Sequence, residues 1–173
     1  IFRFHSVLWI ALFVLMIIVS GCRVDSPTEE YGFYFEEITD VAGIEFVHEK
    51  TEQFDPQVDN IQPWLATTGA GVAVADVDQD GWMYLYFVNA RPGSLNAFYR
   101  NNGDGTFSEM AESLGIASVN DGASSQTALW FDYTNNGYPD LFVGTWGKSR
   151  LFHNNGDGTF TEVTDEAGVD YVG

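Results

Sequence analysis

The chain has 173 residues, of which 25 are acidic and 7 are basic, and its formal net charge is −18. A surface this negative repels nucleic acid and anionic lipid headgroups, so we exclude nucleic-acid binding. The single cysteine excludes a disulfide framework, which leaves metal binding as a possible source of rigidity.

The amino-terminal segment, residues 1–22, contains an apolar run from Val7 to Val19 that is preceded by Arg3 and His5. At about 1.5 Å per residue the run spans about 20 Å, which is too short for a bilayer core and suits a signal peptide. It ends in Val19-Ser20-Gly21-Cys22, which resembles the bacterial lipobox and implies lipidation of Cys22. The alternative is an uncleaved apolar anchor helix. Both predict export to the bacterial cell envelope, with an outer-membrane lipoprotein as the first choice, and residues 23–32 as a polar tether.

A pattern of Phe, Glu, an apolar residue and a short turn ending in Gly occurs three times, at residues 35–44, 107–116 and 160–169. We expect Gly43, Gly115 and Gly168 to take the left-handed conformation that ends such a turn. The first copy predicts a strand near 33–38, which would be the outer strand of a partial repeat unit.

Two acidic loops follow apolar, β-rich runs, and their sequences are Asp76-Val77-Asp78-Gln79-Asp80-Gly81 and Asp132-Tyr133-Thr134-Asn135-Asn136-Gly137. Oxygen side chains at the first, third and fifth positions of a tight loop converge on one hard cation, and calcium suits their loose geometry. An EF-hand is excluded, because its twelfth position falls on Phe87 and Val143. The alternative is a pair of metal-free turns rich in Asp and Asn.

The predicted calcium ligands come from both loops, with backbone carbonyls at the seventh position and a carboxylate at the ninth position of the second loop only. They are Asp76, Asp78, Asp80 and the carbonyl of Trp82, then Asp132, Thr134, Asn136, the carbonyl of Tyr138, and Asp140. The ninth position of the first loop is Tyr84. Because affinity rises with ligand charge, we expect the first loop to bind more tightly, unless the missing ninth ligand outweighs its extra charge.

Strand patterns surround the loops in two repeat units, near 66–116 and 122–169. We expect strands near 71–75, 83–89, 96–100 and 106–110, and then near 125–131, 139–145, 149–153 and 159–163. Asn-Gly-Asp-Gly turns at 101–107 and 154–160 join the last two strands of each unit. Four short strands with a period of about fifty residues predict an all-β fold of β-propeller blades, two complete and one partial.

The Gly69–Gly81 run, followed by Asn-Asn-Gly-Asp-Gly-Thr-Phe, resembles the FG-GAP or VCBS repeat, in particular that of bacterial proteins with an ASPIC/UnbV domain, related to cartilage acidic protein. The resemblance covers roughly residues 33–170, within a predicted domain of residues 33–173, and implies a calcium-stabilised propeller of the integrin type. The departures are Tyr84, Thr134 and Asn136, where acidic residues are expected. Because a propeller needs more blades, and because the chain begins with Ile and stops at Gly173, we expect both ends to be truncated and the chain to be an amino-terminal fragment of a longer product.

Catalytic signals are weak. Ser124 and Ser125 lack a nucleophile elbow, and His48 and His153 stand on strands without a neighbouring nucleophile. Several aromatic residues offer surfaces for stacking on sugars, but we expect them to fill the space between blades: Trp82, Tyr84, Tyr86, Trp130, Tyr133, Tyr138 and Trp146.

The sequence therefore predicts an exported, membrane-anchored, non-enzymatic calcium-binding module that recognises a protein or glycan. The alternative is the scaffold of an extracellular polysaccharide-acting enzyme whose catalytic residues lie outside this chain. A carboxy-terminal domain with paired carboxylates in the complete gene would favour the alternative.

Overall fold

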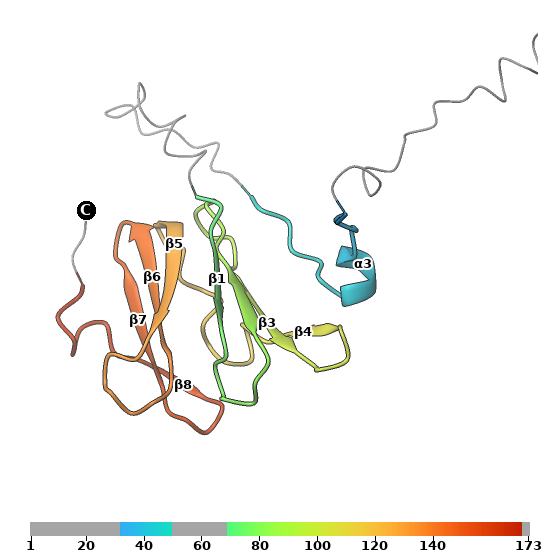
Figure 1. The fold of residues 1–173 in the computed structure, drawn as a ribbon. Helices are drawn as coiled ribbons and strands as arrows, with labels where there is room; N and C mark the ends of the chain where they lie inside the picture. Colours follow the sequence, from blue (N-terminus) through green and yellow to red (C-terminus); the bar gives the residue numbers. More distant parts are fainter. Residues whose placement is uncertain (1–31, 50–68, 171–173) are drawn as a thin grey trace, which may run out of the picture. The chain divides into compact units, whose positions relative to one another are not determined.

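The computed structural model describes residues 32–49 and 69–170 (Figure 1). Contacts divide the chain into two units, residues 1–37 and 38–173. The expected apolar helix, the predicted lipidation site at Cys22 and most of the predicted tether lie outside the described residues. In the part that is described, no helix is both long enough and apolar enough to cross a bilayer.

The second unit contains two antiparallel four-stranded sheets (Figure 1). The first, sheet A, consists of β1 (Val72–Ala75), β2 (Tyr84–Phe87), β3 (Ala97–Asn101) and β4 (Phe107–Glu109) in that order. The second, sheet B, consists of β5 (Ser124–Phe131), β6 (Asp140–Trp146), β7 (Arg150–Asn154) and β8 (Phe160–Glu162). Every strand boundary lies within two residues of its prediction. We call sheet A and its loops blade 1, and sheet B and its loops blade 2.

The two blades have the same connections. An acidic loop joins β1 to β2 and β5 to β6, and an Asn-Gly-Asp-Gly turn joins β3 to β4 and β7 to β8. The two turns close with matching bonds, from Asn102 N to Thr106 O at 3.0 Å and from Asn155 N to Thr159 O at 3.1 Å. The predicted repeat of four strands is therefore confirmed.

The turn that occurs three times also has one structure. Gly43, Gly115 and Gly168 have φ values of 72°, 72° and 67°, as expected for left-handed residues at the end of a helical turn. In the first copy, the short helix α3 (Thr39–Ala42), the amide of Ile44 donates to Thr39 O at 3.1 Å. The amides of Ile116 and Val169 make the equivalent bonds in the other copies.

The strand expected near 33–38 is wrong. Residues 33–38 have no strand structure, and the rings of Phe33 and Phe35 pack edge to face with centroids 6.0 Å apart. A strand forms only where a neighbour supplies ladder hydrogen bonds, and the ladders of sheet A run from β1 to β4 without this segment.

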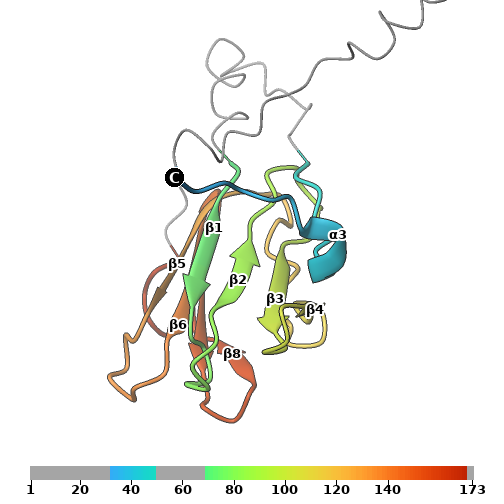
Figure 2. The ribbon, with the colours of Figure 1, turned by 45° about the vertical axis from the view of Figure 1, so that its right-hand side comes forward.

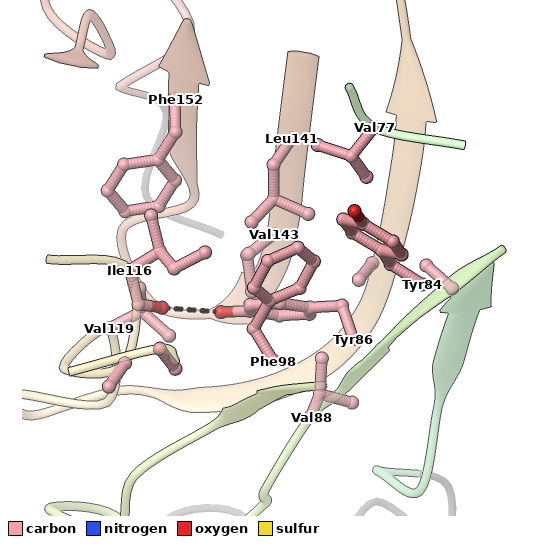
Figure 3. Packing of buried hydrophobic residues seen from close by; sticks show 14 residues of the cluster. Val77, Tyr84, Tyr86, Val88, Phe98, Ile116, Val119, Leu141, Val143 and Phe152 are labelled. Atoms are coloured by element: carbon pink, nitrogen blue, oxygen red, sulfur yellow. Dashed lines mark hydrogen bonds between the residues drawn. The ribbon is translucent and has the colours of Figure 1, made fainter. Parts of the chain in front are cut away.

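The main core lies between the two sheets (Figure 3). Tyr86 and Phe98 from sheet A meet Trp130 from sheet B, with ring centroids 6.2 Å and 5.8 Å from the Trp130 ring. Leu141 and Val143 are fully buried against them. Burying each such side chain contributes about 1.5–3 kcal/mol, so the two sheets stabilise each other.

Glycines before β1 let this segment approach β5 closely. A Cβ on Gly69 would lie 2.5 Å from Ala90 Cβ and 3.0 Å from Ser125 O, and one on Gly71 would lie 3.5 Å from Thr127 Cα. The segment entering β1 thus runs against β5, as Figure 2 also shows. The Gly-Ala-Gly run is therefore a requirement of packing between blades.

The remaining apolar faces are partly open. Within sheet A, Ala73, Tyr86 and Phe98 are cross-strand neighbours on the face that packs against sheet B. Their repeat equivalents are Leu129, Phe142 and Leu151, which share the far face of sheet B, where Leu129 is 54% exposed. The face of sheet A that packs against sheet B thus has an equivalent on sheet B, and that equivalent face is only partly buried.

Candidate metal sites in the two acidic loops

The two acidic loops share one backbone conformation. Gln79 and Asn135, at the fourth position, have φ values of 63° and 57°, and they are the two residues other than glycine with positive φ in the described part of the chain. Gly81 and Gly137, at the sixth position, have φ values of 89° and 92°. Two left-handed residues in a short loop turn the side chains at the first, third and fifth positions inward.

Backbone amides orient the first and fifth side chains in both loops. Gly81 N donates to Asp76 Oδ2 at 3.0 Å, and Gly137 N donates to Asp132 Oδ2 at 2.8 Å. At the fifth position, Trp82 N donates to Asp80 Oδ1 at 2.8 Å. The matching bond in blade 2, from Tyr138 N to Asn136 Oδ1, is 2.9 Å long.

The blade 1 loop brings three carboxylates together. One oxygen from each of Asp76, Asp78 and Asp80 lies within 4.8 Å of the other two. Calcium binds oxygens at about 2.4 Å, so ligands on opposite sides of one ion are about 4.8 Å apart. The second oxygen of Asp76, Oδ1, is buried and accepts no hydrogen bond. A buried anionic oxygen without a donor is costly, and a cation in the loop would satisfy it, so the ligand set fits calcium.

The ninth position of this loop is filled by a phenol. Tyr84 Oη lies 2.8 Å from Asp78 Oδ2 and 3.0 Å from Asp80 Oδ2, and it accepts a bond from Arg100 Nε at 3.0 Å. Arg100 Nη2 also reaches Asp78 Oδ2 at 3.4 Å. Burial, assisted by the hydrogen bond to Asp78, raises the pKa of Tyr84 well above its usual value, so the phenol keeps its proton.

In blade 2 the ninth residue, Asp140, is completely buried and already has three donors. Its Oδ1 accepts a bond from Asn154 N and contacts His153 Nδ1, both at 2.8 Å, and its Oδ2 accepts a bond from Tyr133 N at 2.9 Å. Asp140 thus ties the loop to β7. Thr134 and Asn136, the other predicted ligands, lie on the exposed part of the loop with Asp132.

The seventh residue has a packing role that the sequence analysis did not predict. A Cβ on Gly103 would lie 3.1 Å from Trp82 Nε1, and one on Gly156 would lie 2.7 Å from the Tyr138 ring. The aromatic ring after each acidic loop therefore covers the Asn-Gly turn of its own blade. An aromatic seventh residue in both repeats was the available signal. The ligand role of the Trp82 and Tyr138 carbonyls stays a prediction.

The loops lie at the same end of the two blades (Figures 1 and 2). Gln79 Nε2 donates to Gly137 O at 2.7 Å, and Asn154 Nδ2 donates to Val77 O at 2.9 Å. The loop of blade 1 is therefore bonded directly to the loop and to β7 of blade 2.

The serines considered for catalysis have structural contacts. Ser125 is buried, and its hydroxyl donates to Asn120 Oδ1 at 2.7 Å, while the Ser124 hydroxyl donates to Ala90 O. Asn120 in turn donates to Asn89 O and Ser94 O, at 3.0 Å and 2.9 Å. These bonds link the two blades through a buried polar network that the sequence analysis did not anticipate.

The aromatic residues divide into buried and exposed ones. Tyr84, Tyr86 and Trp130 lie in or against the core between the sheets, as expected. Trp82 and Trp146 are each 48% exposed, and Tyr133 is also exposed.

One known family matches the chain twice, once for each acidic loop. The FG-GAP-like repeat family matches residues 76–143 and again residues 132–171, which together cover more than half of the chain. No curated protein matches the chain. Each match begins at the first residue of an acidic loop, and the first match extends through β5 and the second acidic loop into β6. The chain belongs to the FG-GAP-like repeat family.

Proposed function

We propose that this chain is part of an exported calcium-binding β-propeller, of the kind found with ASPIC/UnbV domains, and that it recognises an extracellular protein or glycan without catalysing a reaction. The buried Asp76 Oδ1 carries the calcium proposal, because it has no donor and belongs to a cluster sized for one ion. In blade 2, Asp132, Thr134, Asn136 and the Tyr138 carbonyl would hold a second ion, with Asp140 as support or ligand.

The propeller proposal is supported by the open sheet faces. Val72 and Val74 of blade 1 are exposed, yet their repeat equivalents Ala128 and Trp130 pack against the neighbouring sheet. Each blade therefore presents one face suited to a preceding blade and one suited to a following blade. Further blades would cover the faces that remain open.

Export rests on the apolar run before Cys22 and on the polar residues that follow it. A lipid on Cys22 would hold the blades at the outer surface of a bacterial membrane. Outside the cell, calcium is plentiful enough to fill sites of modest affinity, and the net charge of −18 attracts cations to the loops.

We assign recognition to two exposed rings, one beside the blade 1 loop and one at the end of β6. Trp82 lies beside the blade 1 loop, and Trp146 lies at the end of β6. Exposed aromatic rings stack on sugars and anchor protein partners, so both kinds of ligand suit this surface.

The test is a calorimetric calcium titration of the purified chain and of an Asp76→Ala, Asp132→Ala double variant. We expect saturable binding and a calcium-dependent rise in Tm, both lost in the double variant. A folded chain that releases no heat and shows no thermal shift would reduce the loops to structural turns.

A further inference from the structure

Arg100 contacts the acidic loop of blade 1 from a neighbouring strand. It lies on β3, and its repeat equivalent on β7 is His153. In the same alignment of the blades, Tyr84 is equivalent to Asp140. In each blade the ninth loop residue thus contacts a basic residue of the neighbouring strand. The ninth residue is a carboxylate in blade 2 and a phenol in blade 1.

The two basic side chains therefore face different partners. His153 Nδ1 lies 2.8 Å from the ninth-position carboxylate of Asp140. Arg100 has no carboxylate at the ninth position, so its Nε donates to the Tyr84 oxygen and its Nη2 reaches the third-position carboxylate of Asp78. In blade 1 the guanidinium of Arg100 therefore contacts the third-position carboxylate of Asp78, whereas in blade 2 the His153 ring contacts the ninth-position carboxylate of Asp140.

Asp78 Oδ2 is engaged twice, because Tyr84 Oη also lies 2.8 Å from it. The same phenol lies 3.0 Å from Asp80 Oδ2. Tyr84 and Arg100 thus occupy oxygens of two of the three carboxylates in the cluster, whereas Asp76 Oδ1 has no partner.

We infer that Arg100 is the internal counter-ion of the blade 1 loop, and that calcium must displace it from Asp78, so that Tyr84 and Arg100 lower the calcium affinity of this loop. The inference rests on the proposed function, since it concerns the same site. This effect opposes the higher negative charge of the blade 1 ligands. The blade 1 loop therefore releases calcium at concentrations where its ligand charge alone would keep the ion bound.

The size of the effect follows from exposure. The side chains of Arg100 and Asp78 are 48% and 36% exposed, so solvent screens their attraction and the ion pair is weak. Calcium therefore displaces Arg100 without prohibitive cost. Neutralising Arg100 should tighten calcium binding about tenfold, because a unit charge close to a divalent ion repels it even in a water-like dielectric.

The experiment uses the full chain with Asp132→Asn, so that calorimetry with calcium chloride reports the blade 1 loop. Arg100→Gln is expected to lower the Kd about tenfold. Arg100→Lys retains the charge and is expected to bind like the parent. Arg91→Gln is the matched control, because it removes the same charge from an exposed ion pair with Glu49, whose members do not belong to the acidic loop. It is expected to change the Kd less than twofold, since screening weakens distant charges.

A second measurement needs no substitution at Arg100. The Nε–H resonance of Arg100, followed by NMR during a calcium titration, is expected to shift as Nη2 of the same guanidinium leaves Asp78. An unmoved resonance at calcium saturation, or Arg100→Gln binding no more tightly than the parent, overturns the inference and leaves the proposed function intact. A folded parent and a folded Arg100→Gln variant that both fail to bind calcium overturn the proposed function as well.

Discussion

The acidic loops of blades 1 and 2 have the same backbone and different surroundings. Both have left-handed residues at the fourth and sixth positions and amide donors to the first and fifth side chains. At the ninth position, blade 1 has a protonated phenol facing its carboxylates, and blade 2 has a buried carboxylate facing its neighbouring strand. The loop motif thus determines the backbone conformation. The strands that follow each loop determine which charged and polar groups surround the ion site.

The largest expected effect is a difference in stability between variants at the ninth positions of the two loops. Asp140→Ala should destabilise the protein by about 3–5 kcal/mol, because it removes a buried carboxylate and leaves the buried amide of Asn154 and the partly buried donors of Tyr133 and His153 unpaired. Tyr84→Phe, the matched change in blade 1, should cost about 1 kcal/mol, since it keeps the ring in the core. Urea denaturation without calcium measures both. Equal costs would show that Asp140 does not hold blade 2 together.

A second comparison concerns glycines within one turn. Gly156 and Gly158 both have positive φ, so alanine strains the backbone at each by about 1–2 kcal/mol. Only at Gly156 would the new methyl press on the Tyr138 ring, since the space beside Gly158 is open. Gly156→Ala should therefore be the more destabilising by about 1–3 kcal/mol in thermal or urea unfolding. If the two variants are equally stable, the ring does not pack on the turn.

A smaller effect tests the link between the loops. Gln79→Ala removes the bond from Gln79 Nε2 to Gly137 O, and it should cost about 0.5–1 kcal/mol at this exposed position. Asn135→Ala is the control, because it changes the equivalent residue of blade 2, which has nearly the same positive φ. A Gln79→Ala variant no less stable than Asn135→Ala would remove this bond from the account.

The smallest effect is one that both blades should share. Bonds from the hydroxyls and amides of Thr106 and Thr159 hold the pKa values of Asp104 and Asp157 below the usual 3.8. A lowered pKa stabilises the fold above the unfolded value of about 3.8, and this contribution is lost as pH falls through the folded pKa. Tm should therefore fall below about pH 4, and less steeply in an Asp104→Asn, Asp157→Asn double variant. Parallel curves for the two proteins would contradict the assignment.

Much of the fold could be predicted because its signals are local. Alternating apolar residues predicted the eight strands, and the glycine that ends each turn predicted the left-handed φ of Gly43, Gly115 and Gly168. The strand near 33–38 failed because strand formation depends on a neighbour, which a local pattern does not reveal.

The candidate site was predicted only in part, for the same reason. Regular spacing identified the Asp76, Asp78 and Asp80 cluster. The contacts of Arg100 with Tyr84 and of His153 with Asp140 join residues of different strands, so they depend on sheet register. Spacing in the chain therefore identified the oxygens, and the three-dimensional pairing identified the groups that compete for them.

The most direct test is a crystal structure of the chain grown in calcium, with anomalous scattering to identify the ion. The account predicts one calcium about 2.3–2.6 Å from oxygens of Asp76, Asp78 and Asp80, with Arg100 no longer bonded to Asp78. Crystals at saturating calcium with no ion in this loop, and with Arg100 still on Asp78, would contradict it.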